Sequence, residues 1–214
     1  MDPFPLAAQQ VLLEEGDPIE HVYFPTGGMC ALTTIMEDGR TVEVTTVGRE
    51  GLLGLSVVFG SNRSSARVIC QVAGGALRVR AHHFKQHFRD SEVLRDVVMR
   101  YAETALVQTQ RNAACNGLHD TESRLSKWLL MARDRLGGSD LPVTQELLAT
   151  TLGVRRSSVS VAAEALHGRG LIDYHRGHIK IRDEPGLEDA ACEDYRAIRD
   201  EEVRQLGPAP ACFS

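Results

Sequence analysis

Residues 144–172 have the sequence TQELLATTLGVRRSSVSVAAEALHGRGLI, and the C-terminal half of the chain is best understood outward from this stretch. Two short helices are expected, at 144–152 and 156–168. Thr144 is a suitable N-cap for the first helix, and Gly153 permits the sharp turn that precedes the second. The stretch therefore predicts two helices that pack against each other across a tight turn.

The spacing of three small or β-branched residues indicates a helix-turn-helix. Such a motif needs a small residue where the helices approach, a turn residue that tolerates positive φ, and a β-branched apolar residue that fixes the second helix to the core. Ala149, Gly153 and Val159 occupy these places. The next segments, LIDYH and HIKIRD, are joined across Arg176-Gly177 and predict a β-hairpin, which would be the wing of a winged helix.

Side chains suited to DNA lie on the outer face of the second helix and on the wing. Residues 154–182 contain six basic and two acidic side chains, within a chain of net charge −5. We expect Arg156 to make a bidentate contact to guanine. Base-edge hydrogen bonds are expected from Ser157 and Ser160, for which plain solvation is the alternative, and packing on a thymine methyl group from Val161. The other expected DNA contacts, mainly to the backbone, come from Gln145, Arg155, Ser158, Arg176, His178 and Lys180.

A long helix is expected at residues 91–116, because Gly and Pro are absent from about residue 80 to Gly117. Leu94, Val98, Tyr101 and Ala105 form an apolar seam along it with spacings of four, three and four, and Gln108, Asn112 and Cys115 continue the seam. A narrow seam between two globular parts favours a dimer interface. A second helix, from an N-cap at Asp120 to Gly137-Gly138, follows.

Residues 10–80 contain five segments rich in β-formers, VLLEE, HVYFP, MCALTTIM, TVEVTTV and ARVICQV, separated by turn signals that include Thr26-Gly27-Gly28. The expected fold class is therefore α+β: an N-terminal β-roll, a long dimerisation helix and a C-terminal winged helix-turn-helix. The expected boundaries are 1–90 for the roll, 91–119 for the dimerisation helix, 120–190 for the DNA-binding domain, and 191–214 for an acidic terminal helix and a loose tail.

Composition places the chain among ordinary globular proteins, because 43% of its 214 residues are hydrophobic and 25% are charged. No apolar run is long enough to span a bilayer and the N-terminus lacks the features of a signal peptide, so we expect no membrane contact and a cytoplasmic location. The five cysteines are scattered without a C-x-x-C pair, which argues against a disulfide framework and against a thiolate metal site. No metal and no other cofactor are expected.

The order of these parts resembles the Crp/Fnr family of bacterial transcription regulators. The resemblance rests on LGVRRSSVSVAAEALHGRGLI, which is similar to the family's recognition helix and wing entry. It rests also on GLLGL at 51–55 with RSSA at 63–66, which is similar to the family's phosphate-binding turn. It implies a homodimer that binds a symmetric site on double-stranded DNA and contacts or blocks RNA polymerase. The possible effector-binding residues are Gly51, Leu52, Arg63, Ser64 and Ser65.

The sequence departs from the family pattern at two sites. Members that bind cyclic nucleotides have a Glu after the turn glycine, whose carboxylate holds the ribose hydroxyls, whereas Leu52 follows Gly51 here. In the recognition helix, the Arg, Glu and Arg of Crp-type operator readers correspond to Arg156, Ser157 and Val161. We therefore expect an effector other than cyclic AMP, or none, and a different operator. The cysteine cluster of oxygen-sensing members is absent.

Two other functions are weaker alternatives. A cupin-like metalloprotein would use the neighbouring His82, His83 and His87, of which the last two share a helical face, although no carboxylate motif accompanies them. A ligand-sensing module would use its C-terminal half to bind another protein instead of DNA. No nucleophile, base and orienting residue can be grouped, so there are no catalytic candidates and an enzyme is not expected.

Overall fold

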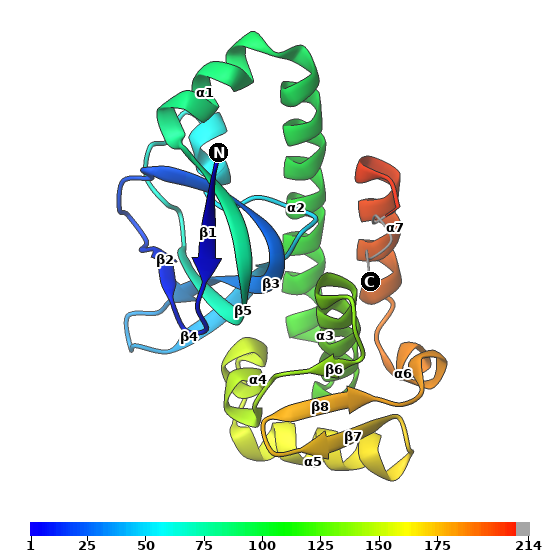
Figure 1. Ribbon diagram of the computed structural model, residues 1–214. Coiled ribbons are helices and arrows are strands. Elements are labelled where there is room, and N and C mark those ends of the chain that lie inside the picture. Colours follow the sequence, from blue (N-terminus) through cyan, green and yellow to red (C-terminus); the bar gives the residue numbers. More distant parts are fainter. Residues whose placement is uncertain (209–214) are drawn as a thin grey trace.

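The N-terminal part is an antiparallel β-roll. The computed structural model describes residues 1–208, and the expected loose tail lies partly outside them, at 209–214. The strands are β1 (Asp2–Leu6), β2 (Val11–Leu13), β3 (His21–Ile35), β4 (Thr41–Val47) and β5 (Arg67–Arg80), with a short 3-10 helix, η1 (Leu55–Phe59). The strand order is β1-β5-β3-β4, and β2 also pairs with β5. Figure 1 shows the roll packed against one side of a long helix.

The turn expected at Thr26-Gly27-Gly28 does not form. HVYFP and MCALTTIM instead belong to the single 15-residue strand β3, which shifts its register against β5 at Gly27 and Met29. Gly28 has φ +78°, and a Cβ atom there would lie 2.5 Å from the carbonyl oxygen of Val72. The glycines therefore form a bulge in a continuous strand rather than a chain reversal. A bulge and a tight turn both favour glycine, because each requires positive φ or a close approach of the backbone.

Strand β1 was not expected, because Pro3 and Pro5 argue against a strand in the interior of a sheet. The strand pairs only with β5 and so lies at the edge of the sheet, where a residue without an N–H donor is tolerated.

Three helices follow the roll: α1 (Ala81–Asp90), α2 (Glu92–Leu118) and α3 (Thr121–Leu136). The Ser91 side chain caps α2 by accepting a hydrogen bond from the backbone N–H of Leu94. Asp120 caps α3 as expected, at 2.9 Å from the N–H of Ser123. Only His119 and Asp120 separate α2 from α3, so this short link joins the roll and its long helix to the C-terminal part of the chain, residues 121–206.

The C-terminal part contains the predicted elements and one strand that was not predicted. Helices α4 (Gln145–Leu152) and α5 (Arg156–Gly168) precede the hairpin strands β7 (Ile172–His175) and β8 (His178–Ile181). A two-residue strand, β6 (Asp140–Leu141), pairs with the other edge of β8. The wing is therefore a three-stranded sheet, and the missed strand is too short to show periodicity.

The sequence predicts one acidic, solvated helix over residues 185–205, but this segment forms two helices. Three residues separate α6 (Glu184–Ala190) from α7 (Asp194–Leu206), and Figure 1 shows α7 running beside α2. Tyr195 and Ile198 of α7 are buried in the core of the C-terminal part. The acidic sequence of α7 does not indicate this packing, because only one narrow side of the helix is apolar.

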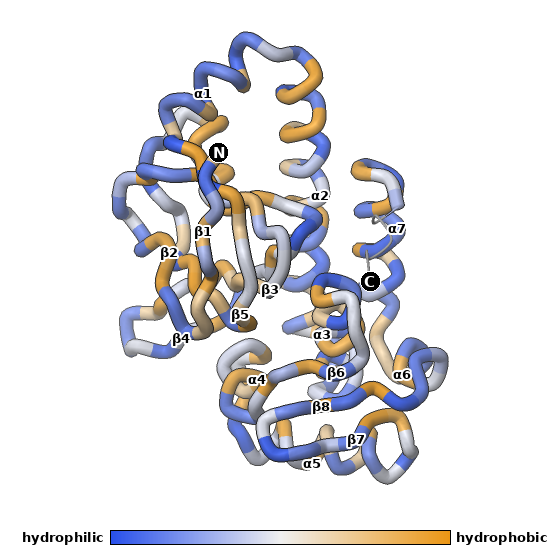
Figure 2. Tube along the Cα trace, in the orientation of Figure 1, coloured by the Kyte–Doolittle hydropathy of each residue, from blue (hydrophilic) through white to orange (hydrophobic). Residues whose placement is uncertain are grey.

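Two hydrophobic cores meet at the contact between the roll and the C-terminal part. One fills the roll, and the other is built on α3 to α7 and the wing but also contains Met29 and Val72 of the roll. Figure 2 shows apolar segments on facing sides of this contact. Buried Arg135 of α3 strengthens it, with Nε 2.9 Å from Glu50 of the roll and Nη2 3.1 Å from Glu202 of α7. Among residues 1–208, no helix is both long and apolar enough to cross a membrane.

Candidate nucleic-acid interface

The helix-turn-helix forms as the sequence predicts. The Thr144 hydroxyl accepts a hydrogen bond of 3.2 Å from the N–H of Leu147, and Gly153 ends α4 with φ 64°. The inner face of α5 is buried against α3 and the wing by Val159, Ala162, Ala163 and Leu166. Because this inner face is fixed in the core, the opposite side of α5 is held in one orientation toward solvent.

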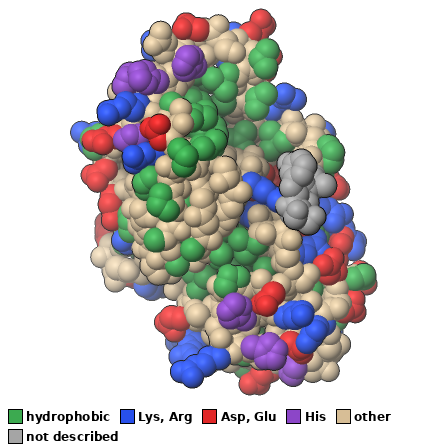
Figure 3. All heavy atoms as spheres, viewed as in Figure 1, with side chains coloured by type: hydrophobic (Ala, Val, Ile, Leu, Met, Phe, Trp, Pro, Cys, Tyr) green, Lys and Arg blue, Asp and Glu red, His purple; other side chains and the backbone are tan. Residues whose placement is uncertain are grey.

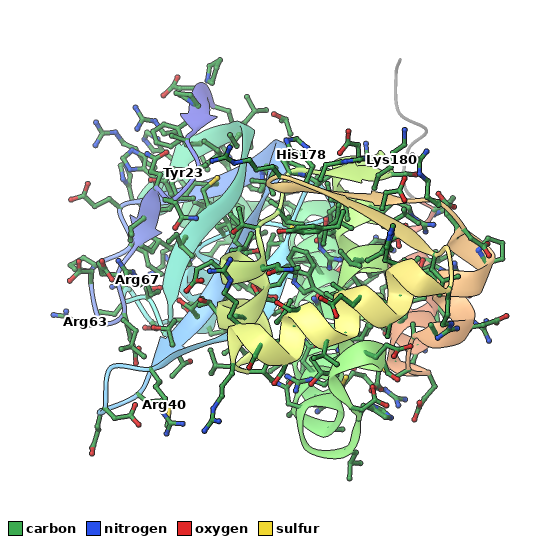
Figure 4. All side chains as sticks on the ribbon, turned by 90° about the horizontal axis from the view of Figure 1, so that it is seen from below. Tyr23, Arg40, Arg63, Arg67, His178 and Lys180 are labelled. Atoms are coloured by element: carbon green, nitrogen blue, oxygen red, sulfur yellow. The ribbon has the colours of Figure 1, made fainter. Side chains whose placement is uncertain are left out.

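The outer face of α5 presents most of the expected base-reading side chains. Arg155, Arg156 and Ser157 are exposed at its start, and Val161 is 68% exposed although it is apolar. Figure 4 shows α5 lying across the lower surface of the molecule, with nothing in front of it. An exposed valine on a helix that has a fully apolar inner face is suited to contact with a thymine methyl group.

Three expected contact residues on α4 and α5 are less free. The Ser160 hydroxyl donates a hydrogen bond of 3.0 Å to Oε1 of Gln145 and also bonds the carbonyl oxygen of Arg156. Ser158 is partly buried between the helices. The Ser160–Gln145 bond links the start of α4 to the middle of α5, so these residues position the helix pair as well as offering polar groups to DNA.

Arg156 has a weak partner only. Its Nη1 atom lies 4.0 Å from Glu146, and both side chains are largely exposed. An exposed pair of this length contributes little and is easily exchanged. The guanidinium group is therefore available for a bidentate contact beside the positive end of the α5 dipole.

Acidic neighbours reduce the positive charge that the wing can offer to DNA phosphates. Lys180 of β8 lies in register between Asp140 of β6 and Asp173 of β7, so its ammonium group shares a sheet face with two carboxylates. His178 Nδ1 lies 3.2 Å from Asp140. A hydrogen bond from Arg182 holds the pKa of Asp173 below its usual range. Figure 3 shows histidine and basic side chains interspersed with acidic ones over this region.

Arg176 stands at the turn between β7 and β8 and is exposed. The tip of the wing is thus farther from the carboxylates at its base than Lys180 is. Sequence reasoning missed this difference because it depends on the pairing of β8 with two other strands.

A cavity of about 740 Å³ lies between the roll and α2, at the place of the expected effector site. Leu52, Arg63, Ser64 and Ser65 line it. Arg63 is exposed at the edge of the roll and donates a hydrogen bond of 2.6 Å to the carbonyl oxygen of Gly16. Figure 4 shows this edge position. Ser64 bonds the carbonyl oxygen of Ala66, so its hydroxyl is also engaged within the chain.

Gly51 is not part of this lining and has a packing role. A Cβ atom at Gly51 would lie 2.4 Å from the ring of Tyr101, whose hydroxyl faces the carbonyl oxygen of Leu52 at 3.4 Å. The glycine therefore lets the aromatic ring of α2 lie directly against the turn.

The residues of the expected dimer seam pack on the roll of their own chain. Val98 and Tyr101 are buried in the core of the roll, and Leu94 and Ala105 are partly buried against the same core. Val98 and Tyr101 therefore offer little surface to a second copy. The sequence pattern shows that a stripe is buried but not against what.

The histidine group of the cupin-like alternative lies on α1. His82, His83 and His87 are all exposed, and the rings of the first two are tilted by 54° with centroids 4.0 Å apart. They face solvent outside the roll, as is expected for a connecting helix.

Two protein-family models match the chain. The cyclic nucleotide-binding domain matches residues 3–91, and the Crp-like helix-turn-helix domain matches residues 123–190. The two matches correspond to the β-roll and to the part that carries α5 and the wing. No curated protein sequence matches the chain.

Solved structures share the fold at low identity. FixK2 from Bradyrhizobium japonicum is 16% identical with a TM-score of 0.78, over 89% of this chain and 97% of that one. A Crp/Fnr-family regulator from Thermus thermophilus is 20% identical with a TM-score of 0.71, over 89% and 98%. The c-di-GMP responsive global regulator CLP from Xanthomonas campestris is 16% identical with a TM-score of 0.68, over 84% and 93%.

Proposed function

The chain is a DNA-binding transcription regulator of the Crp/Fnr type, and from this premise we propose that it binds a two-fold symmetric operator as a homodimer. The observation that carries this proposal is the outer face of α5, exposed and held by a fully buried inner face. Two copies related by a two-fold axis would place their α5 helices in successive major grooves, about 34 Å apart.

The dimer contact that we propose is a face of α2 different from the sequence-based seam. Met99 and Leu106 are 47% and 52% exposed, and Ala113 is also exposed. These residues are spaced by seven, so they form one stripe along the helix. Helix α7 covers another side of α2, where Arg111 meets Asp194 at 3.5 Å. The stripe is therefore open to the same helix of a second copy.

Specific contacts in this proposal come from α5, and phosphate contacts come from the surrounding cations. Arg156 binds guanine, Ser157 and Val161 contact neighbouring bases, and Arg155 and Arg176 contact phosphates. Ser157 and Val161 replace the Glu and second Arg of the Crp-type readers that the sequence resembles, so the operator differs from theirs. The chain acts as a regulator and not as an enzyme, with RNA polymerase as its further partner.

The effector that we propose is not cyclic AMP. Leu52 supplies no carboxylate for ribose hydroxyls, and Arg63 is bonded to the backbone of Gly16. One regulator of similar fold is described as c-di-GMP responsive, so binding assays should include that ligand beside cyclic AMP and cyclic GMP.

Selection of bound duplexes from a random pool tests the proposal, because it reports DNA binding, symmetry and base preference together. We expect an inverted repeat whose half-site centres are one helical turn apart. Enrichment of a single half-site would refute the symmetric dimer, and absence of any enrichment would refute sequence-specific binding.

A further inference from the structure

Four potential metal ligands meet where the end of α2 passes the link between α6 and α7. The Cys115 and Cys192 sulfur atoms lie 3.5 Å apart, and the Cys192 sulfur is 3.8 Å from Oδ2 of Asp194. His119 Nδ1 is 3.5 Å from the same carboxylate oxygen. The four ligand atoms all lie within 4.8 Å of one another.

Three of the six separations between ligand atoms match the edges of a tetrahedral zinc site. Zinc binds sulfur at about 2.3 Å and nitrogen or oxygen at about 2.0 to 2.2 Å, so the tetrahedral edges are about 3.8 Å between two sulfurs, about 3.5 Å from sulfur to oxygen, and about 3.4 Å from nitrogen to oxygen. The observed 3.5, 3.8 and 3.5 Å agree with these edges to about 0.3 Å. One ion at the centre could contact all four residues.

The imidazole of His119 is oriented for this role. Its Nδ1 atom is buried and has no hydrogen-bond partner among the described residues. Its other nitrogen, Nε2, lies 3.3 Å from the carboxylate of Glu193. A carboxylate that accepts the proton of one ring nitrogen leaves the lone pair of the other for a metal, as is typical of histidine ligands. The orphaned nitrogen is directed into the cluster.

The burial of the cluster and the charges around it also suit a bound metal ion. Cys115 is fully buried, Asp194 is 2% exposed and Cys192 is 7% exposed, whereas the His119 side chain is 23% exposed, so three of the four ligands are shielded from solvent. The Lys127 ammonium group lies near the Cys115 sulfur, and Arg111 Nη1 is 3.5 Å from Asp194. A divalent ion bound by two thiolates and one carboxylate carries one net negative charge, which the neighbouring Lys127 and Arg111 cations offset.

We propose that Cys115, His119, Cys192 and Asp194 bind one Zn²⁺ ion in a closed, structural site. Thiolate and imidazole donors in tetrahedral geometry favour zinc over the harder divalent ions. The site ties the last turn of α2 and the two-residue link to α3 to the start of α7. Zinc binding does not depend on the proposed function. Only its consequence for DNA, a fixed angle between the long helix and the DNA-binding part, rests on that function.

The sequence alone does not predict this group, and no metal is expected from it. Cys115 and Cys192 are 77 residues apart, and each contributes a short pair of ligands, Cys115 with His119 and Cys192 with Asp194. The missed signal is the i,i+4 spacing of Cys115 and His119 at the end of a helix. Cys192 and Asp194 join this pair only because α7 packs on α2, which the sequence does not show.

The test is metal binding by the full chain without DNA. Reduced protein is incubated with zinc, freed of excess by gel filtration and analysed for metal, and affinity is measured by competition with a chromophoric chelator. We expect one zinc ion per chain. Substitution of cobalt should give the intense visible absorption of a tetrahedral, sulfur-ligated ion.

Variants separate this site from general thiol binding. His119→Ala, at a partly exposed residue, and Cys192→Ser should each weaken zinc affinity at least about tenfold. The matched control is Cys70→Ser, which changes one member of the buried Cys30–Cys70 pair of β3 and β5 and should keep full zinc affinity. Absence of zinc from the reduced, reconstituted protein would overturn the proposal, as would full affinity in both site variants. A Cys115–Cys192 disulfide that takes up no zinc after reduction would assign the pair to redox chemistry instead.

Discussion

Arg156 is the residue on which base recognition most depends. Its side chain is 68% exposed in the first turn of α5 and is restrained only by the weak contact with Glu146. We expect Arg156→Ala to cost roughly 1 to 3 kcal/mol on the best operator and to relax preference at one base position, because a bidentate contact to guanine is lost. Fluorescence anisotropy with the operator and with single-base variants measures both effects.

Lys180→Ala is the control for Arg156→Ala. Lys180 lies in register with Asp140 and Asp173, so its contribution to phosphate binding is small and independent of sequence. The variant should weaken operator and random duplexes to the same small extent. Equal losses on operator and random DNA for Arg156→Ala would show that Arg156 is a phosphate contact only.

Among the helices and strands, the features that depend only on neighbouring residues were predicted correctly from the sequence. The caps at Thr144 and Asp120 and the buried face of α5 formed as expected, because each depends on a few neighbours in sequence. The Gly27–Gly28 turn and the single terminal helix over residues 185–205 were wrong, and the dimer seam packs on the roll of its own chain. Each depends on which distant segment lies opposite, and a sequence pattern shows that a surface is buried without showing its partner.

We expect Glu43 of β4 to make the contact between the roll and the DNA-binding part sensitive to pH. Its carboxylate accepts hydrogen bonds from Gln71 at 2.6 Å and from the indole of Trp128 in α3 at 3.2 Å. Burial of the carboxyl group raises its pKa to about 7. The folded state therefore binds a proton that the unfolded state releases between about pH 4.5 and pH 7. This contribution to stability is present at low pH and is lost as the pH rises through 7.

We expect Glu43→Gln to remove this term. The wild type should lose roughly 1 to 3 kcal/mol more unfolding free energy than the variant between pH 5 and pH 8, measured by urea denaturation. Glu15→Gln, at an exposed residue of the roll, is the control and should retain the wild-type dependence. The prediction fails if wild type and Glu43→Gln show the same difference between the two pH values.

The whole molecule is proposed to assemble through the Met99, Leu106 and Ala113 stripe of α2. Leu106→Glu should weaken the dimer at least about a hundredfold, because burial of two symmetry-related leucines is worth roughly 3 to 6 kcal/mol. Analytical ultracentrifugation across a concentration series measures the change. Val93→Glu is the control, since Val93 is 75% exposed but lies about 140° around the helix from Leu106. A stable dimer in Leu106→Glu, or a monomeric wild type at micromolar concentration, would exclude this interface.

Control of the whole molecule by a cyclic nucleotide would require the cavity between the roll and α2 to bind one tightly. Its volume of about 740 Å³ is sufficient, so fit alone does not exclude such a ligand. Recognition is the obstacle: Leu52 is apolar at the place where the family resemblance puts a ribose-binding carboxylate, and Arg63 is engaged with Gly16.

Each buried ribose hydroxyl left without a partner costs about 1 to 3 kcal/mol, so two weaken binding by about two orders of magnitude or more. We therefore expect no micromolar binding of cyclic AMP or cyclic GMP in calorimetric titrations of the full-length protein. The same titration is repeated with operator DNA present, because a true effector must bind the DNA-bound and free states with different affinity. Micromolar binding that also tightens operator affinity would contradict the prediction and would show that the cavity recognises ribose through groups other than residue 52.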